Sequence, residues 1–217
     1  MREALATMLR MQDRINTQVH PEWIAQEFAW HRAIWVECAE LVDHYGYKWW
    51  KRQEHDIAQV QLEVVDIWHF GLSALFTADS NIEALAQQTA SCWPQHIEAT
   101  GVLEAAERLA AIAAGERRFS IAAFAALLAA ADMGFGELYR QYLGKNVLNR
   151  FRQDHGYKDG SYRKQWAGRE DNEHLAELLA ELLADPVAGP LDDHADMRTD
   201  AEARLYEALS QRYAGVA

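Results

Sequence analysis

Two pairs of carboxylates with the same spacing are the residues of this chain best suited to chemistry. Glu37 and Glu40 lie in WVECAEL, and Glu63 and Asp66 lie in EVVD. A spacing of three residues puts both members of a pair on one side of a helix. Acids gathered from two neighbouring helices repel one another unless a cation lies between them, and Mg²⁺ prefers oxygen ligands. The spacing therefore predicts a Mg²⁺ site that could activate a water and neutralise phosphates.

Other interpretations of these acids remain open, because E-x-x-E alone is a weak signal. Glu37 and Glu40 could simply flank the apolar face of their helix. Glu63 and Asp66 are harder to explain in that way, since they are the only acids in the apolar stretch 62–76 and an unpaired buried carboxylate is costly. A di-iron site would use Glu-x-x-His on two helices, and only Asp66 with His69 approximates that pattern.

A basic segment far along the chain supplies the opposite charge. Between Lys145 and Lys164 there are six Lys or Arg residues against two Asp, with aromatic residues interleaved. Arg and Lys bind phosphate oxygens, and Gly156 and Gly160 allow the backbone to approach a ligand closely. The segment 145–166 is thus predicted to bind phosphates, although a solvated basic loop would have a similar composition.

The elements that must position these residues are predicted to be helices. Apolar residues recur at helical spacing over residues 2–18, 21–45, 56–76 and 172–183. The same spacing predicts two or three Ala-rich helices between 80 and 131, a helix through Leu138 and Tyr142, and a final helix after an acidic loop near 185–190. From Leu62 to Phe76 the apolar side chains point nearly all round the axis, which indicates a buried central helix. No fixed repeat and no alternating strand pattern is evident. We expect an all-α fold.

Composition limits the remaining possibilities. The chain has 217 residues, of which 50% are hydrophobic, enough for a single helical domain over 1–217 with 80–135 as a less recognisable insertion. A formal net charge of −12 disfavours a nucleic-acid partner. No apolar run is long enough for a membrane span and the first residues are too charged for a signal peptide, so we expect a cytoplasmic location. The two cysteines, Cys38 and Cys92, are expected to be buried thiols.

Four motifs, in this order, resemble one known family. WVECAEL, YKWWK, EVVDIWHF and KNVLNRFRQDHGYKDGSYRKQW resemble the dimeric all-α deoxyuridine triphosphatases (dUTPases), which belong to the helical, MazG-like NTP pyrophosphohydrolases. The acid pairs are shared across that superfamily, and the GYK-x-G-x-Y-x-K-x-W continuation is more specific. The resemblance implies Mg²⁺-dependent hydrolysis of dUTP, and of dUDP, to dUMP by a homodimer with no nucleic-acid or membrane partner. Residues 80–135 and the C-terminal tail carry no recognisable motif.

The resemblance also implies roles for individual residues. The metal ligands would be Glu37, Glu40, Glu63 and Asp66, with Glu40 also orienting or deprotonating the attacking water. Phosphate contacts, or contacts that order the closing segment, would come from Lys48, Lys51, Asn149, Arg152, Tyr157, Lys158 and Lys164. Trp50 would stack near the base, and Gln12 and Asn16 would help to hold the deoxyuridine.

Two alternatives to dUTP hydrolysis remain at this point. A helical pyrophosphohydrolase with a different base preference would keep the acids and change the pocket. A helical module without enzymatic activity would use the acids structurally and show no response to Mg²⁺.

Overall fold

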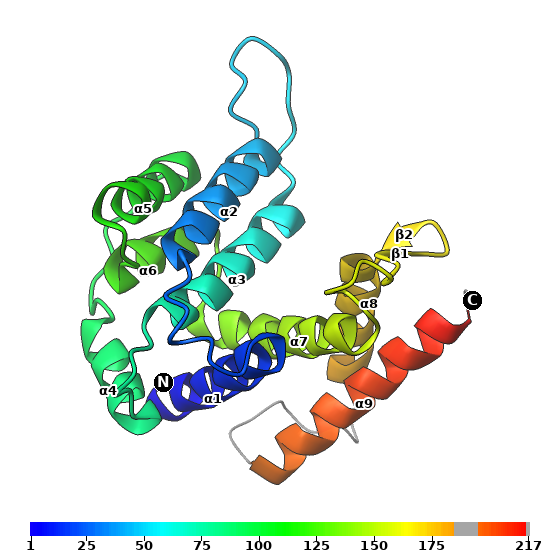
Figure 1. The fold of residues 1–217 in the computed structure, drawn as a ribbon. Helices are drawn as coiled ribbons and strands as arrows, with labels where there is room; N and C mark the ends of the chain where they lie inside the picture. Colours follow the sequence, from blue (N-terminus) through cyan, green and yellow to red (C-terminus); the bar gives the residue numbers. More distant parts are fainter. Residues whose placement is uncertain (185–194, 216–217) are drawn as a thin grey trace.

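The computed structural model describes residues 1–184 and 195–215, which form nine helices and one short hairpin (Figure 1). The elements are α1 (Arg2–Val19), α2 (Trp30–Tyr45), α3 (Ile57–Ala74), α4 (Ile82–Cys92), α5 (Val102–Glu116), α6 (Ile121–Ala130), α7 (Phe135–Asp154), β1 (Gln165–Trp166), β2 (Arg169–Glu170), α8 (Asp171–Ala184) and α9 (Ala195–Ala214). The two strands pair antiparallel and have only two residues each. The predicted all-α class is confirmed.

Helix α3 is the central helix, as its apolar pattern predicted. It packs against α1, α2, α6 and α7, and Val64, Ile67 and Trp68 on it are fully buried. Asp56 caps its first turn, because its side chain accepts a hydrogen bond from the backbone N–H of Gln59 at 3.2 Å. The second acid pair therefore projects from a helix that is surrounded by others.

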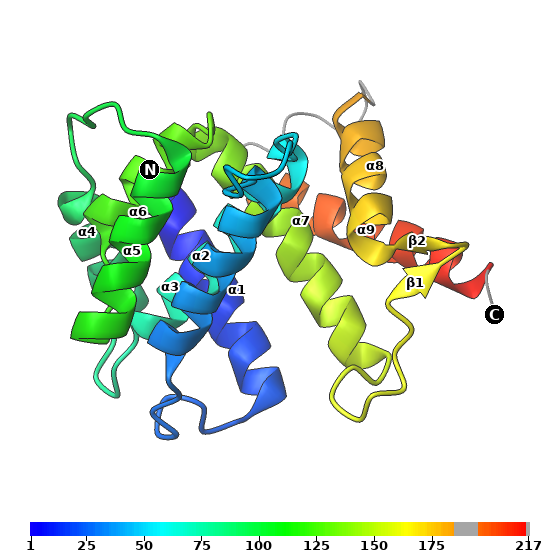
Figure 2. The same cartoon turned by 90° about the horizontal axis from the view of Figure 1, so that it is seen from above.

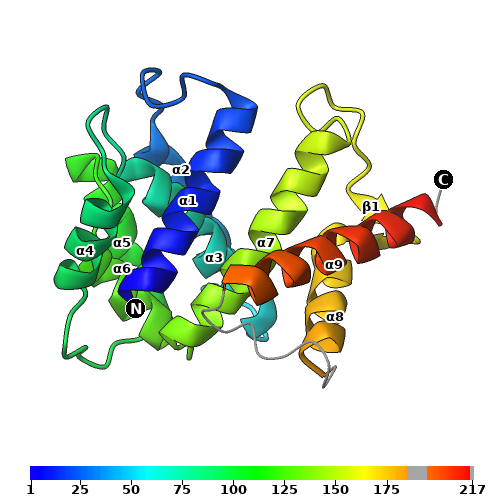
Figure 3. The same cartoon turned by 90° about the horizontal axis from the view of Figure 1, so that it is seen from below.

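Helix α7 lies between the helices α1–α6 and the pair α8 and α9 (Figures 2 and 3). It contributes residues to two hydrophobic cores. Its first half, including Tyr142, belongs to the large core formed with the helices before it, while Phe151 in its second half packs with Trp166, α8 and α9. Gly144 lies between the two halves and allows α8 to approach, since a Cβ there would lie 2.6 Å from a methyl carbon of Leu179. The buried apolar residues of the basic segment 145–166, among them Phe151 and Trp166, belong to the second core.

The second predicted helix starts later than its apolar pattern suggested. We expected a helix over 21–45, but α2 begins at Trp30 and the residues before it form turns. Glu27 has a φ of 48°, which is incompatible with a continuous helix. Trp23 is buried, and its ring packs edge-on against Trp30 and Phe76 at centroid distances of 6.0 and 5.1 Å. Packing of these aromatic rings outweighs the local helical preference.

Two further details differ from the sequence prediction. The first ten residues of 145–166 are the last turns of α7, and the loop starts only at His155. There Gly156 has a φ of +86°, a conformation that glycine adopts without strain. Cys38 is buried as expected, but Cys92 is exposed at the end of α4. The acidic loop near 185–190 lies outside the described residues.

No single helix in the described ranges is long and apolar enough to cross a membrane. Helices α6 and α7 satisfy that test of length and composition only as a pair, and their axes are bent by 97°.

Candidate active site

A cavity of about 500 Å³ lies among α1, α2, α3, α7 and the start of α8. Its walls combine carboxylates, amides, basic side chains and aromatic rings. The lining residues are Gln12, Ile15, Asn16, Val19, Trp23, Phe28, Trp30, Glu37, Glu40, Glu63, Asp66, His69, Phe70, Lys145, Asn149, Arg152, Gln153, Tyr157, Lys164 and Asn172. Ten of the fourteen residues predicted for the site are among them.

Three of the four predicted acids converge closely. Carboxylate oxygens of Glu37, Glu63 and Asp66 lie within 4.8 Å of one another, a spacing that suits a shared cation. Glu40 lines the same cavity one turn along α2, but it is exposed and does not belong to this close group. Helices α2 and α3 pack side by side, and this packing brings the two predicted pairs together.

Burial and mutual repulsion change the acidity of the group. Burial, a hydrogen bond with Glu63 and repulsion from the neighbouring acids raise the pKa of Glu37 to about 9. Burial also raises the pKa of Glu63. Two carboxylates this close without a cation share a proton, and a divalent ion would replace that proton.

The structure adds a lysine to the acidic wall. Lys145 Nζ on α7 lies 2.8 Å from Asp66 Oδ2 and donates a second hydrogen bond to Asn172 Oδ1 at 3.2 Å. The sequence around EVVD offered no such partner, because Lys145 is 79 residues away. One lysine against three ionised carboxylates leaves the group with an excess of two negative charges, which one divalent cation would balance.

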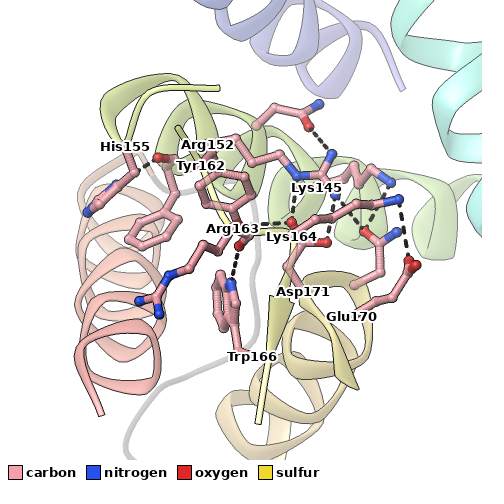
Figure 4. A network of polar contacts seen from close by, with 12 residues as sticks. Lys145, Arg152, His155, Tyr162, Arg163, Lys164, Trp166, Glu170 and Asp171 are labelled. Atoms are coloured by element: carbon pink, nitrogen blue, oxygen red, sulfur yellow. Dashed lines mark hydrogen bonds and ion pairs between the residues drawn. The ribbon is translucent and has the colours of Figure 1, made fainter. Parts of the chain in front are cut away.

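Basic side chains of the same cavity are held by a polar network (Figure 4). Arg152 donates to both carboxylate oxygens of Asp171 at 2.8 Å and to Asn149 Oδ1 at 3.2 Å. Lys164 forms an ion pair with Glu170 at 3.4 Å. Arg152 and Lys164 place positive charge at the cavity, so this wall suits the oxygens of a phosphate chain.

Gln12 and Asn16 are part of a buried network rather than ordinary surface residues. Gln12 Nε2 donates to Asn16 Oδ1 at 3.1 Å, and both amides donate to Ser73 Oγ at 3.0 and 2.9 Å. The hydroxyl of Tyr142 donates to Gln12 Oε1 at 2.9 Å. These bonds fix the orientation of two amides that line the cavity, as recognition of a base or sugar requires.

His69 is a cavity residue that sequence reasoning did not select. Its Nδ1 donates to the carbonyl oxygen of Val65 at 2.9 Å, and its ring stacks on Tyr142. Its Nε2 is buried and has no hydrogen-bond partner within the described ranges. Burial lowers the pKa of His69 to about 4, so the neutral ring can accept a hydrogen bond from a bound molecule. Its position three residues after Asp66, on the same helix face, is the signal that could have revealed it.

Four residues predicted to bind substrate lie outside the cavity. Lys48, Trp50 and Lys51 belong to the loop 46–56, which projects from the end of α2 (Figure 1). Lys48 forms an ion pair with Asp43 at 3.0 Å, and Trp50 is 60% exposed. Lys158 Nζ donates to the carbonyl oxygen of Val19 at 3.0 Å. Their contacts with substrate stay predictions.

Comparison with known proteins identifies one family that the sequence matches. The sequence profile of one family, described as dUTPase, matches residues 4–157, which include the four acids and the amides on α1. A search of curated proteins finds no match. The matched range covers most of the chain and ends within the basic loop. The chain therefore belongs to the all-α dUTPase family and is a dUTP diphosphatase, a hydrolase acting on a nucleotide.

Proposed function

We propose that the chain hydrolyses dUTP, and also dUDP, to dUMP in a reaction that depends on Mg²⁺. The observation that carries this proposal is that the acid group and the basic side chains line one cavity. The negative oxygens of a polyphosphate need cationic side chains around them. Carboxylates can in addition bind the divalent ion that neutralises phosphate charge.

The donor set fits Mg²⁺. Glu37, Glu63 and Asp66 offer only oxygen atoms, and Glu40 on the same wall is the fourth proposed ligand. When bound, the ion would neutralise phosphate charge and lower the pKa of a coordinated water.

The protein side chains would divide the remaining work. Glu40 is exposed to the cavity and would orient the attacking water and accept its proton. The water oxygen would bond to one of the two phosphorus atoms of the α–β bridge while the bond from that phosphorus to the bridging oxygen breaks, so that dUTP gives dUMP and pyrophosphate and dUDP gives dUMP and phosphate. Arg152, Asn149 and Lys164 would hold the phosphate oxygens, and Tyr157 would cover them.

Recognition of deoxyuridine is proposed for the other end of the cavity. Gln12 and Asn16 would hydrogen-bond the nucleoside, and the neutral Nε2 of His69 would accept a hydrogen bond from it. Trp30 and Phe70 line the same region with stacked rings, 6.2 Å apart, that suit a flat base. The proposed Trp50 contact would require movement of its loop or a second copy of the chain, which agrees with the proposed homodimer. A cytoplasmic location is part of the same proposal.

Hydrolysis of a nucleotide panel tests the proposal. The protein is incubated with each dNTP, each NTP and dUDP, with Mg²⁺ or with EDTA, and monophosphate is measured. We expect product only from dUTP and dUDP, and only with Mg²⁺. Hydrolysis of several bases at similar rates would support a different base preference, and unchanged rates in EDTA would refute the metal dependence. Glu63→Gln serves as the inactive control and Glu116→Gln, on exposed surface of α5, as the active one.

A further inference from the structure

Asp171 is the most deeply buried charged side chain near the cavity, yet it does not line it. Its exposed fraction is 0%, and it is the first residue of α8. It lies beyond the range 4–157 that the dUTPase profile matches. A fully buried carboxylate is costly unless it is paired and hydrogen-bonded, so its partners indicate what it does.

Asp171 holds Arg152 along one edge of its guanidinium, the edge formed by Nε and Nη2. Arg152 Nε donates to Oδ2 and Nη2 donates to Oδ1, both at 2.8 Å (Figure 4). Such a bidentate pair fixes the plane of the guanidinium as well as its position. Tyr162 donates to Oδ2 at 2.9 Å and thereby fixes the carboxylate.

The remaining donors of Arg152 are directed by its other contacts. Nη1 donates to Asn149 Oδ1 at 3.2 Å, and Nη2 has a weaker contact with Asn172 Oδ1 at 3.4 Å. Arg152 is half-buried and lines the cavity, so its guanidinium is held by these contacts and is also within reach of a bound phosphate.

The backbone of Asp171 joins the same region to the basic loop. Its N–H donates to the carbonyl oxygen of Lys164 at 2.9 Å, and Lys164 is itself a cavity residue. Asp171 thus contacts the side chain of Arg152 through its carboxylate and the backbone of Lys164 through its amide.

We propose that Asp171 is a positioning residue for the phosphate-binding wall, acting through Arg152. This inference rests on the proposed role of Arg152 in binding phosphates. It assigns a function to the start of α8, which ties the C-terminal helices to the site. Asp171 does not line the cavity, and its proposed effect is to keep the guanidinium of Arg152 fixed at the cavity wall.

A double-mutant cycle separates positioning from a merely structural role. Asp171→Asn keeps the shape and removes the charge, and Arg152→Gln removes the phosphate contact. We expect Asp171→Asn to lower kcat/KM for dUTP about 10- to 100-fold, because a small displacement of a positioning group has an effect of that size. In the double variant, activity is expected to match Arg152→Gln within about twofold. If the fold losses in kcat/KM of the two single variants multiply in the double variant, the proposal is overturned.

Binding of Mg²⁺ with inorganic tripolyphosphate supplies a readout that does not depend on hydrolysis. Calorimetry is expected to show about 10-fold weaker binding to Asp171→Asn and unchanged affinity for deoxyuridine. Wild-type affinity for tripolyphosphate in this variant would refute the positioning role. A wild-type protein that binds tripolyphosphate but does not hydrolyse dUTP would instead refute the proposed function.

Two further variants control for folding. Glu177→Gln, on the same helix and paired with Arg169 and Arg212, is expected to keep wild-type kcat/KM. If Asp171→Asn does not fold, as judged by circular dichroism, Tyr162→Phe decides the question. It is expected to lower kcat/KM at least about threefold, and to have no effect when Arg152→Gln is present. An unchanged kcat/KM in Tyr162→Phe would then overturn the proposal.

Discussion

Lys145 Nζ lies 2.8 Å from Asp66 Oδ2 and joins the two charged walls of the cavity across 79 residues of sequence. The lysine side chain is only 4% exposed, and it also donates to Asn172 at the start of α8. The ion pair connects α3 with α7, and the hydrogen bond to Asn172 connects α7 with α8. The lysine also lowers the negative charge that a bound cation would meet.

Replacing Lys145 is expected to change stability and metal affinity in opposite directions. Lys145→Met leaves Asp66 without its partner, so the free energy of unfolding in EDTA should fall by about 2 kcal/mol, less than for a fully buried pair because Asp66 is partly exposed. Mg²⁺ should bind more tightly, since the acid group is then more negative. Chemical denaturation and calorimetry check the two effects. Lys51→Met, in the exposed loop, is the matched control, and weaker Mg²⁺ binding in Lys145→Met would contradict the argument.

Substitutions of Glu40 and of Glu63 are expected to impair the enzyme in different ways. Glu63 belongs to the close carboxylate group and Glu40 does not, although both line the cavity. Glu63→Gln should therefore weaken Mg²⁺ binding strongly. Glu40→Gln should lower kcat at least about 100-fold with a smaller change in Mg²⁺ affinity, because it removes the group that handles the water. Metal titrations of kcat measure both quantities. Equal loss of Mg²⁺ affinity in the two variants would show that Glu40 is an ordinary ligand.

The raised pKa of Glu37 predicts that stability without metal depends on pH. The folded state binds this proton more tightly than the unfolded chain, whose pKa is near 4.5, because burial and neighbouring acids raise the folded value to about 9. This contribution to stability is complete below pH 4.5 and is lost as the pH rises toward 9. Thermal melts in EDTA between pH 5 and 9 measure it. Saturating Mg²⁺ should flatten the curve, and Glu37→Gln should flatten it without metal. A slope that persists in Glu37→Gln would assign the effect to other groups.

Trp50 provides a test of the loop that projects from α2. Trp49 and Trp50 are adjacent, exposed by 89% and 60%, and pack edge-on against each other. If Trp50 stacks near the base, Trp50→Ala should lower kcat/KM for dUTP about tenfold, the size typical of one base–aromatic contact. Trp49→Ala is the matched control and should have a smaller effect. Mixing the Trp50→Ala and Glu63→Gln proteins should restore activity if the loop of one chain contacts the cavity of a second copy. It should not restore activity if the loop closes over the cavity of its own chain.

The local sequence pattern was sufficient to predict most of the helices and to single out the two acid pairs. The apolar spacing of α3 predicted a buried helix, and the same spacing made Glu63 and Asp66 stand out within it. The pattern failed at 21–29, where Trp23 and its ring contacts turn the chain before α2. Aromatic packing against Phe76 comes from a residue more than 50 positions away, so no local window contains it.

The sequence by itself determined the chemical types at the site: carboxylates at matched spacing, a basic segment, and motifs that resemble the all-α dUTPases. Those properties follow from helix periodicity and from the composition of short segments. Only the tertiary structure decided which groups meet. It pairs Lys145 with Asp66, buries Asp171 against Arg152, and leaves His69 Nε2 without a partner in the part of the chain that the structure describes. These relationships depend on how α3, α7 and α8 pack, and packing is set by side-chain fit across distant segments rather than by local spacing.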